Sequence, residues 1–172
     1  MGGKKLHLYV LKFDQTPFGD ATTHWALFLH DPTFVNYRDG MPYAFDQDGI
    51  PICGTLFHLR KSSGGITSFG ELQYRQYPKF QVSGQPLLRS TLKLKCDGVT
   101  NEHLDQACQR ISNAISYNLF TENCQEWVKK VLEDLVCQKI IPWTVLKQME
   151  RGGFKTLKEQ GKESSSSICF NF

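Results

Sequence analysis

Apolar and polar positions alternate loosely through the first half of the chain, a pattern that predicts β-strands. Over 6–13 the alternating residues are rich in aromatic and branched side chains, and similar segments follow. Clusters of Pro, Gly, Asp and Asn separate these segments and predict turns. The expected strands cover 6–13, 22–30, 54–60, 69–77 and 91–95, with turns at 14–21 and 61–65 and a long loop at 31–53.

The second half changes to the spacing of amphipathic helices. From 102 to 117 the apolar positions fall on one face, and Asn101 or Thr100 can cap the helix. From 123 to 139, Val and Leu recur at intervals of three and one, which predicts a second helix. A third, short helix is expected over 143–150.

The order of these elements predicts the fold class. Strands first and helices second are typical of an α+β domain, in which an antiparallel sheet packs against helices. A chain of 172 residues has the length of one domain, which we place at 1–158. The serine-rich segment after it predicts a flexible polar tail over 159–172.

Composition excludes several classes of protein. The net charge of +3 comes without a basic run, so we expect no nucleic-acid partner. No stretch approaches the roughly 20 apolar residues of a membrane span, so no transmembrane segment is expected. The chain also has no Walker A motif and no glycine-rich dinucleotide fingerprint after a strand, which argues against a nucleotide site.

The six cysteines show neither a CxxC pair nor a tight framework spacing, and the chain has no secretory signal pattern. We therefore expect reduced thiols in a cytoplasmic protein, with no metal and no cofactor. The cysteines are Cys53, Cys96, Cys108, Cys124, Cys137 and Cys169.

One cysteine stands at the start of a predicted helix. In the run Asn123-Cys124-Gln125-Glu126, Asn123 is a favoured N-cap, and Glu126 can complete a capping box. Cys124 is then the first helical residue, where unpaired N–H groups and the helix dipole stabilise a thiolate. It lies four residues before Val128, on the face that looks into the protein. The alternative is that Cys124 is a small buried hydrophobic residue.

A thiolate nucleophile needs a base, which is usually a histidine. His24 and His58 lie in the middle of predicted strands, among apolar neighbours. An unpaired buried ring nitrogen costs about 1–3 kcal/mol, and a second histidine and a thiolate would satisfy it. The alternative is a histidine at a sheet edge that bonds to water or to a backbone carbonyl. We expect His7, His30 and His103 to be structural or exposed.

Three short segments resemble a known family. The runs HWALF at 24–28, LFHL at 56–59 and NCQEWV at 123–128 resemble the two histidine strands and the Asn-Cys-Glu-His-Phe-Val helix start of the lecithin retinol acyltransferase-like family. The same motifs are similar to those of small fungal proteins of this superfamily. The resemblance implies a circularly permuted papain-like thiol fold, in which the nucleophile helix follows the sheet.

The resemblance also implies roles for individual residues. Cys124 would be the nucleophile, His24 the general base and His58 the group that orients His24. We therefore expect a cysteine-dependent hydrolase or acyltransferase that forms an acyl-thioester from an amide, ester or thioester. The backbone N–H of Cys124 would stabilise the oxyanion together with a second donor. The candidates for that donor are Gln125, Trp25 and Tyr9.

Two departures from the family leave alternatives open. The histidines are much further apart in the chain than in the tight hairpin of the lipid acyltransferases, and a polar C-terminus replaces their membrane-anchoring helix. Both put a phospholipid substrate in doubt. The alternatives are an isopeptidase on ubiquitin-like tails, a tailoring enzyme for a small metabolite, and a non-catalytic binding module of the same fold. The loop 31–53 would be a lid or an ordinary surface loop.

Overall fold

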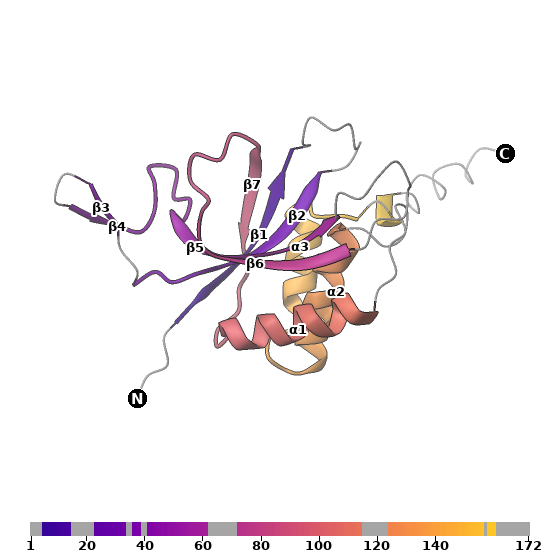
Figure 1. Cartoon of the computed structure of the whole chain (residues 1–172). Coiled ribbons are helices and arrows are strands. Elements are labelled where there is room, and N and C mark those ends of the chain that lie inside the picture. The colour runs from indigo at the N-terminus through magenta and orange to yellow at the C-terminus, as the bar shows by residue number, and fades with distance from the viewer. Residues whose placement is uncertain are drawn as a thin grey trace.

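A five-stranded antiparallel sheet forms the framework of the protein (Figure 1). The computed structural model describes residues 5–14, 23–33, 36–38, 41–61, 72–114, 124–156 and 158–160. The strands of the sheet are β1 (His7–Phe13), β2 (His24–His30), β5 (Cys53–Lys61), β6 (Leu72–Gln81) and β7 (Leu88–Lys93). Their order across the sheet is β6-β5-β2-β1-β7, so β5, β2 and β1 are interior strands. An antiparallel sheet with helices confirms the α+β prediction.

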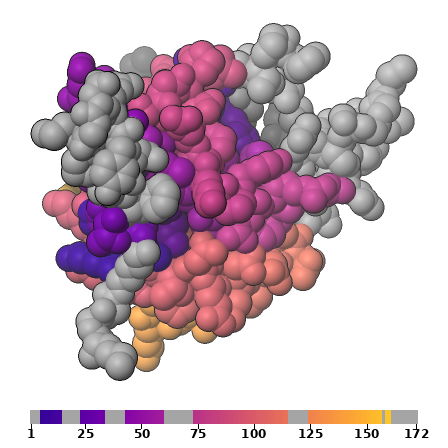
Figure 2. Space-filling model, turned by 60° about the vertical axis from the view of Figure 1, so that its left-hand side comes forward, coloured from indigo at the N-terminus to yellow at the C-terminus, as the bar shows by residue number. Residues whose placement is uncertain are grey.

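Among the described residues, three helices of eight residues or more follow the strands and lie on one side of the sheet (Figure 1). They are α1 (Asn101–Ala114), α2 (Cys124–Cys137) and α3 (Thr144–Arg151). Helix α2 packs on β2 and β5, and α1 packs on α2, β5 and β6. In Figure 2 the salmon and orange surface of the helices borders the magenta strands along one side of the molecule.

The start of α1 shows which of the two candidate caps is used. The hydroxyl of Thr100 accepts the backbone N–H of His103 at 3.1 Å, and the Thr100 carbonyl accepts the N–H of Leu104. Thr100 is therefore the N-cap, since its side chain satisfies a donor that the helix leaves unpaired. Residues 115–117 of the predicted helix lie outside the described residues.

Alternation along β1 and β2 divides the core into two parts. Leu8, Val10, Trp25 and Leu27 belong to the larger cluster, which the helices complete with residues such as Trp127. The intervening residues of the same strands, including Tyr9, Leu11, Ala26 and Phe28, form a second cluster on the opposite face with Leu56 and Val82. Because successive side chains of a strand point to opposite faces, both faces of the interior strands are buried.

The predicted loop 31–53 contains structure that the sequence pattern did not show. The short strands β3 (Asn36–Arg38) and β4 (Met41–Tyr43) pair as a separate two-stranded sheet. Continuous loop was therefore the wrong prediction for this segment. Three residues per strand and a proline in β4 leave too little alternation for a strand to be recognised.

The other element boundaries differ by a few residues. The last strand is three residues earlier than expected, at 88–93 in place of 91–95, and the strand expected at 69–77 spans 72–81. The start of the predicted tail is also held in place. Residues 158–160 are helical, and the Glu159 carboxylate pairs with Lys129 and accepts the backbone N–H of Thr156.

In its described part the chain has no helix with the length and apolarity needed to span a bilayer.

Candidate functional site

The two histidines singled out in the sequence contact each other. His58 lies within β5, as expected, whereas His24 is the first residue of the neighbouring antiparallel strand β2 and not in its middle. The mid-strand prediction for His24 was wrong because strand pairing begins only at His24. Nε2 of His24 and Nδ1 of His58 are 3.2 Å apart, a hydrogen-bond distance, and the rings are nearly perpendicular at 88°. Leu27 pairs with Phe57, which makes His24 and His58 diagonal neighbours on one face of the sheet.

The surroundings of the pair keep His24 neutral. Burial, followed by the proximity of His58, lowers the pKa of His24 from 6.5 to about 4. Desolvation penalises the charged form of an imidazole, and a second imidazolium alongside would repel it. At neutral pH the ring is therefore uncharged and has a lone pair that can accept a proton.

Both histidines lie on the sheet face opposite the helices. Trp25 and Leu27 on β2 belong to the helix-covered cluster, so His24 points the other way, and its ring lies 6.3 Å from that of Phe13. His58 alternates in the same manner between Phe57 and Leu59, and its ring lies 5.3 Å from that of Tyr77.

Cys124 is the first residue of α2, as the sequence predicted. Its side chain is half-buried, and Sγ lies 4.0 Å from the carbonyl oxygen of Thr23, the distance of a weak S–H···O bond. Thr23 immediately precedes His24, so this contact holds the thiol beside the start of β2. Glu126 is in the first turn of α2 and is buried. The expected cap, Asn123, lies outside the described residues.

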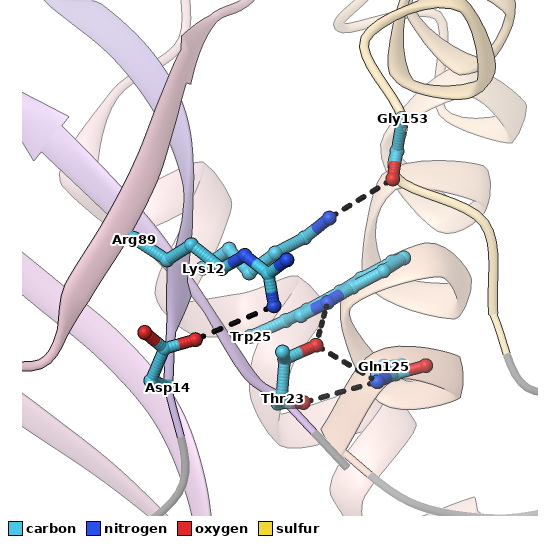
Figure 3. A network of polar contacts seen from close by, with 7 residues as sticks. All are labelled: Lys12, Asp14, Thr23, Trp25, Arg89, Gln125 and Gly153. Atoms are coloured by element: carbon cyan, nitrogen blue, oxygen red, sulfur yellow. Dashed lines mark hydrogen bonds and ion pairs between the residues drawn. The ribbon is translucent and has the colours of Figure 1, made fainter.

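Thr23 connects the start of α2 to the start of β2 (Figure 3). The side-chain amide of Gln125 donates to the Thr23 carbonyl at 3.0 Å and lies 3.4 Å from the Thr23 hydroxyl. The same hydroxyl accepts the indole N–H of Trp25 at 3.3 Å. The structure thus gathers Cys124, Gln125 and Trp25 around one residue that the sequence analysis did not single out.

Tyr9, the third candidate oxyanion donor, lies elsewhere. It pairs with Phe28 in the β1–β2 register, whereas His24 pairs with Phe13. Four residues along a strand correspond to roughly 13 Å. The structure does not bring Tyr9 to His24, and we do not include it in the site. The Trp25 indole N–H and the Gln125 amide are engaged with Thr23.

The remaining histidines have structural environments. His30 is buried, and its Nδ1 lies 2.9 Å from the carbonyl oxygen of Cys53, which makes it the donor of that bond. It faces His7 across β1 and β2, with 6.2 Å between ring centroids. Burial lowers the pKa of both imidazoles. Nδ1 of His103 accepts the backbone N–H of Thr100 at the start of α1.

Part of the predicted loop 31–53 is fixed to the sheet. One oxygen of the Asp46 carboxylate accepts the backbone N–H groups of Asp48 and Ile50, and the other accepts the hydroxyl of Ser83. These bonds lower the pKa of Asp46 despite its partial desolvation. Phe45 packs its ring edge-on to His30, with centroids 4.9 Å apart. This segment therefore closes the second cluster and is anchored there.

Most cysteines other than Cys124 are poor candidates for a nucleophile. Burial, and then the charge of Asp97, raises the pKa of Cys96 to about 11, and burial also raises the pKa of Cys53 and of Cys108. Cys137 is exposed at the far end of α2. Cys169 lies outside the described residues. In the part of the chain that the structure describes, no group of three or more His, Cys, Asp or Glu side chains could hold a metal ion.

Comparison with known proteins found no matching family model, no matching curated protein and no matching solved structure.

Proposed function

We propose that the protein is a cysteine-dependent hydrolase or acyltransferase with Cys124 as nucleophile, His24 as general base and His58 as the residue that orients His24. One observation carries the proposal. A helix starts at a cysteine whose thiol contacts the residue next to His24, and the His24 ring is itself bonded to a second histidine. A nucleophile, a base and an orienting group in series are the arrangement that thiol catalysis requires.

The His24–His58 bond assigns the two nitrogens of His24. Nε2 faces His58, so Nδ1 is the nitrogen that receives the thiol proton. For Nδ1 to accept, Nε2 must carry the ring hydrogen and donate it to Nδ1 of His58. With a pKa of about 4, His24 is an uncharged acceptor at neutral pH and takes the proton as the S–C bond forms.

The proposed mechanism requires a change of rotamer at Cys124. Sγ rests against the Thr23 carbonyl, and rotation about the Cα–Cβ bond must exchange that oxygen for the His24 imidazole. The thiolate then attacks a substrate carbonyl carbon, and the carbonyl π electrons move to the oxygen. The backbone N–H of Cys124, at the positive end of the α2 dipole, stabilises this oxyanion.

Collapse of the tetrahedral intermediate completes the acyl transfer. The oxyanion re-forms the carbonyl, the bond to the leaving group breaks, and the leaving group takes the proton from His24. This produces an acyl-thioester on Cys124. Water, or an alcohol or amine acceptor, gives its proton to His24 and attacks the thioester, which releases the acyl product and restores the thiol.

Acylation of the protein by simple substrates tests the proposal. Wild type is incubated with p-nitrophenyl acetate and with short-chain acyl-thioesters, then digested, and the acylated cysteine is identified by mass spectrometry. The acyl group is expected on Cys124 and is lost in Cys124→Ala. We expect His24→Asn to slow acylation by roughly a hundredfold or more, the usual contribution of a general base.

Cys137 provides the matched control. It lies at the other end of the same helix and is more exposed, so its acylation measures how easily the reagent reaches a thiol outside the site. Cys137→Ala identifies that background signal by removing it. Acylation that follows exposure, with Cys137 labelled faster than Cys124, would refute the proposal. Capture of Cys124 by a ubiquitin-like vinyl probe, without turnover of the small esters, would instead support the isopeptidase alternative.

A further inference from the structure

We propose that Gln125 is a positioning residue, which acts through Thr23 to set the approach of Cys124 to His24. This inference rests on the proposed function, because it assigns a role relative to that nucleophile and base. Gln125 would not touch the substrate. Its effect would be on the position of the thiol and on the pH dependence of thiol reactivity.

Gln125 is a polar side chain in an interior position. It is 3% exposed, and it follows Cys124 in the first turn of α2. A buried amide costs free energy unless its hydrogen-bonding groups are satisfied. Here the amide donates to the Thr23 carbonyl at 3.0 Å, with the Thr23 hydroxyl 3.4 Å away. The side chain therefore specifies where the helix start lies against β2.

The acceptor is itself held firmly. The Thr23 hydroxyl accepts the indole N–H of Trp25, which is 1% exposed and packs edge-on to Phe154 at 5.2 Å. Lys12 adds a second tie, because its ammonium donates to the Gly153 carbonyl at 2.9 Å and lies 4.5 Å from the Phe154 ring. Figure 3 shows Lys12 pointing toward the Gly153 carbonyl, and Trp25 and Gln125 meeting at Thr23. Thr23 is thus a fixed reference point for α2.

The Thr23 carbonyl oxygen has two donors of unequal strength. The Gln125 N–H lies at 3.0 Å, and the Cys124 thiol, a weak donor, lies at 4.0 Å. While the amide satisfies the carbonyl, the thiol can leave it at small cost and turn to His24. If the amide is lost, the carbonyl needs another donor and holds the thiol, while the helix start loses its tie to the strand.

Two substitutions that keep the approximate volume of the side chain distinguish the effect of the Gln125 hydrogen bond from the effect of its packing. Gln125→Glu keeps the shape but replaces the donor by a carboxylate, which repels the Thr23 carbonyl. Gln125→Met keeps the length and removes the hydrogen bond. Gln138→Glu is the matched control, because it makes the same chemical change at an exposed position just beyond the end of α2.

The readout is the rate of alkylation of Cys124 by iodoacetamide from pH 5 to pH 10, followed by mass spectrometry of the peptide. For both Gln125 variants we expect a rate at least tenfold lower near neutral pH and a profile displaced to higher pH. Gln138→Glu is expected to overlay wild type. A purely structural role for Gln125 would lower the unfolding midpoint and leave the pH profile unchanged.

The outcomes separate this inference from the proposed function. If wild-type Cys124 reacts no faster than Cys137, the proposed function fails. If wild-type Cys124 reacts fast and both Gln125 variants overlay it, only the positioning role is overturned. Should neither variant fold, Gln125→Asn replaces them, since it keeps a buried amide but shortens the side chain by one methylene and so draws the donor away from the Thr23 carbonyl. Alkylation slowed at least threefold is expected, and a wild-type profile overturns the inference.

Discussion

Acidification is expected to destabilise the fold through His24. In the unfolded chain this imidazole titrates near 6.5, whereas in the folded protein burial and His58 lower its pKa to about 4. Below pH 6.5 the unfolded state therefore binds a proton that the folded state excludes. Stability is fully present above pH 6.5, falls as the pH drops toward 4, and levels off below that. A pKa difference of this size corresponds to a loss on the order of 3 kcal/mol in the free energy of unfolding.

Other groups titrate over the same range, so the test is a comparison with a variant. His24→Gln removes the titrating group and keeps an amide that can bond to His58. Urea unfolding is followed by tryptophan fluorescence at several values between pH 7 and pH 4. We expect the variant to lose about 3 kcal/mol less stability over this range than wild type. The slope of the unfolding free energy against urea concentration should stay the same at each pH, which checks that unfolding remains two-state.

The comparison with wild type decides the point, because the two proteins differ only in the side chain at position 24. If His24→Gln instead runs parallel to wild type from pH 7 to pH 4, His24 is not buried as a neutral ring.

Two further predictions concern close packing. Gly54→Ala is expected to cost at least about 2 kcal/mol, because a Cβ there would lie 2.4 Å from the Leu29 carbonyl oxygen and 2.5 Å from the ring of Phe28. A wild-type urea midpoint would show that β5 can move away from β2. Ser112→Ala is expected to cost about 1–3 kcal/mol, because it removes the acceptor at 3.0 Å from the buried indole N–H of Trp127. The thermal midpoint measures that loss, and an unchanged midpoint would contradict it.

The interior strands of the sheet could be predicted because they are built from the residue types that strands favour. Strands β1 and β2 bury residues on both faces, and aromatic and branched residues mark them clearly in the sequence. Strand β7 was predicted two to three residues too late because it lies at an edge, where none of its residues is fully buried and polar residues interrupt the pattern. Strands β3 and β4 were missed because three residues carry no measurable period.

Only part of the candidate site could be predicted in the same way. His24, His58 and Cys124 have side chains whose chemistry is distinctive, and each lay in a clear strand or at a helix start. Thr23 has neither signal. Its importance comes from a backbone carbonyl and a hydroxyl that meet a helix about a hundred residues later in the chain. No local pattern specifies which residue will receive such a contact.

Alternation along β2 places a strict condition on the proposed chemistry. Trp25 faces the helices and His24 faces away from them, so the sheet itself separates the histidine from most of α2. The thiol can reach the histidine only around the end of β2, where the strand has not yet begun and Thr23 lies. The pairing of His24 with Phe13 fixes that end. A slip of one residue in this register would exchange His24 with Trp25 and place an indole where the base must be. The position at which β2 begins is therefore as much a part of the site as the side chains it presents.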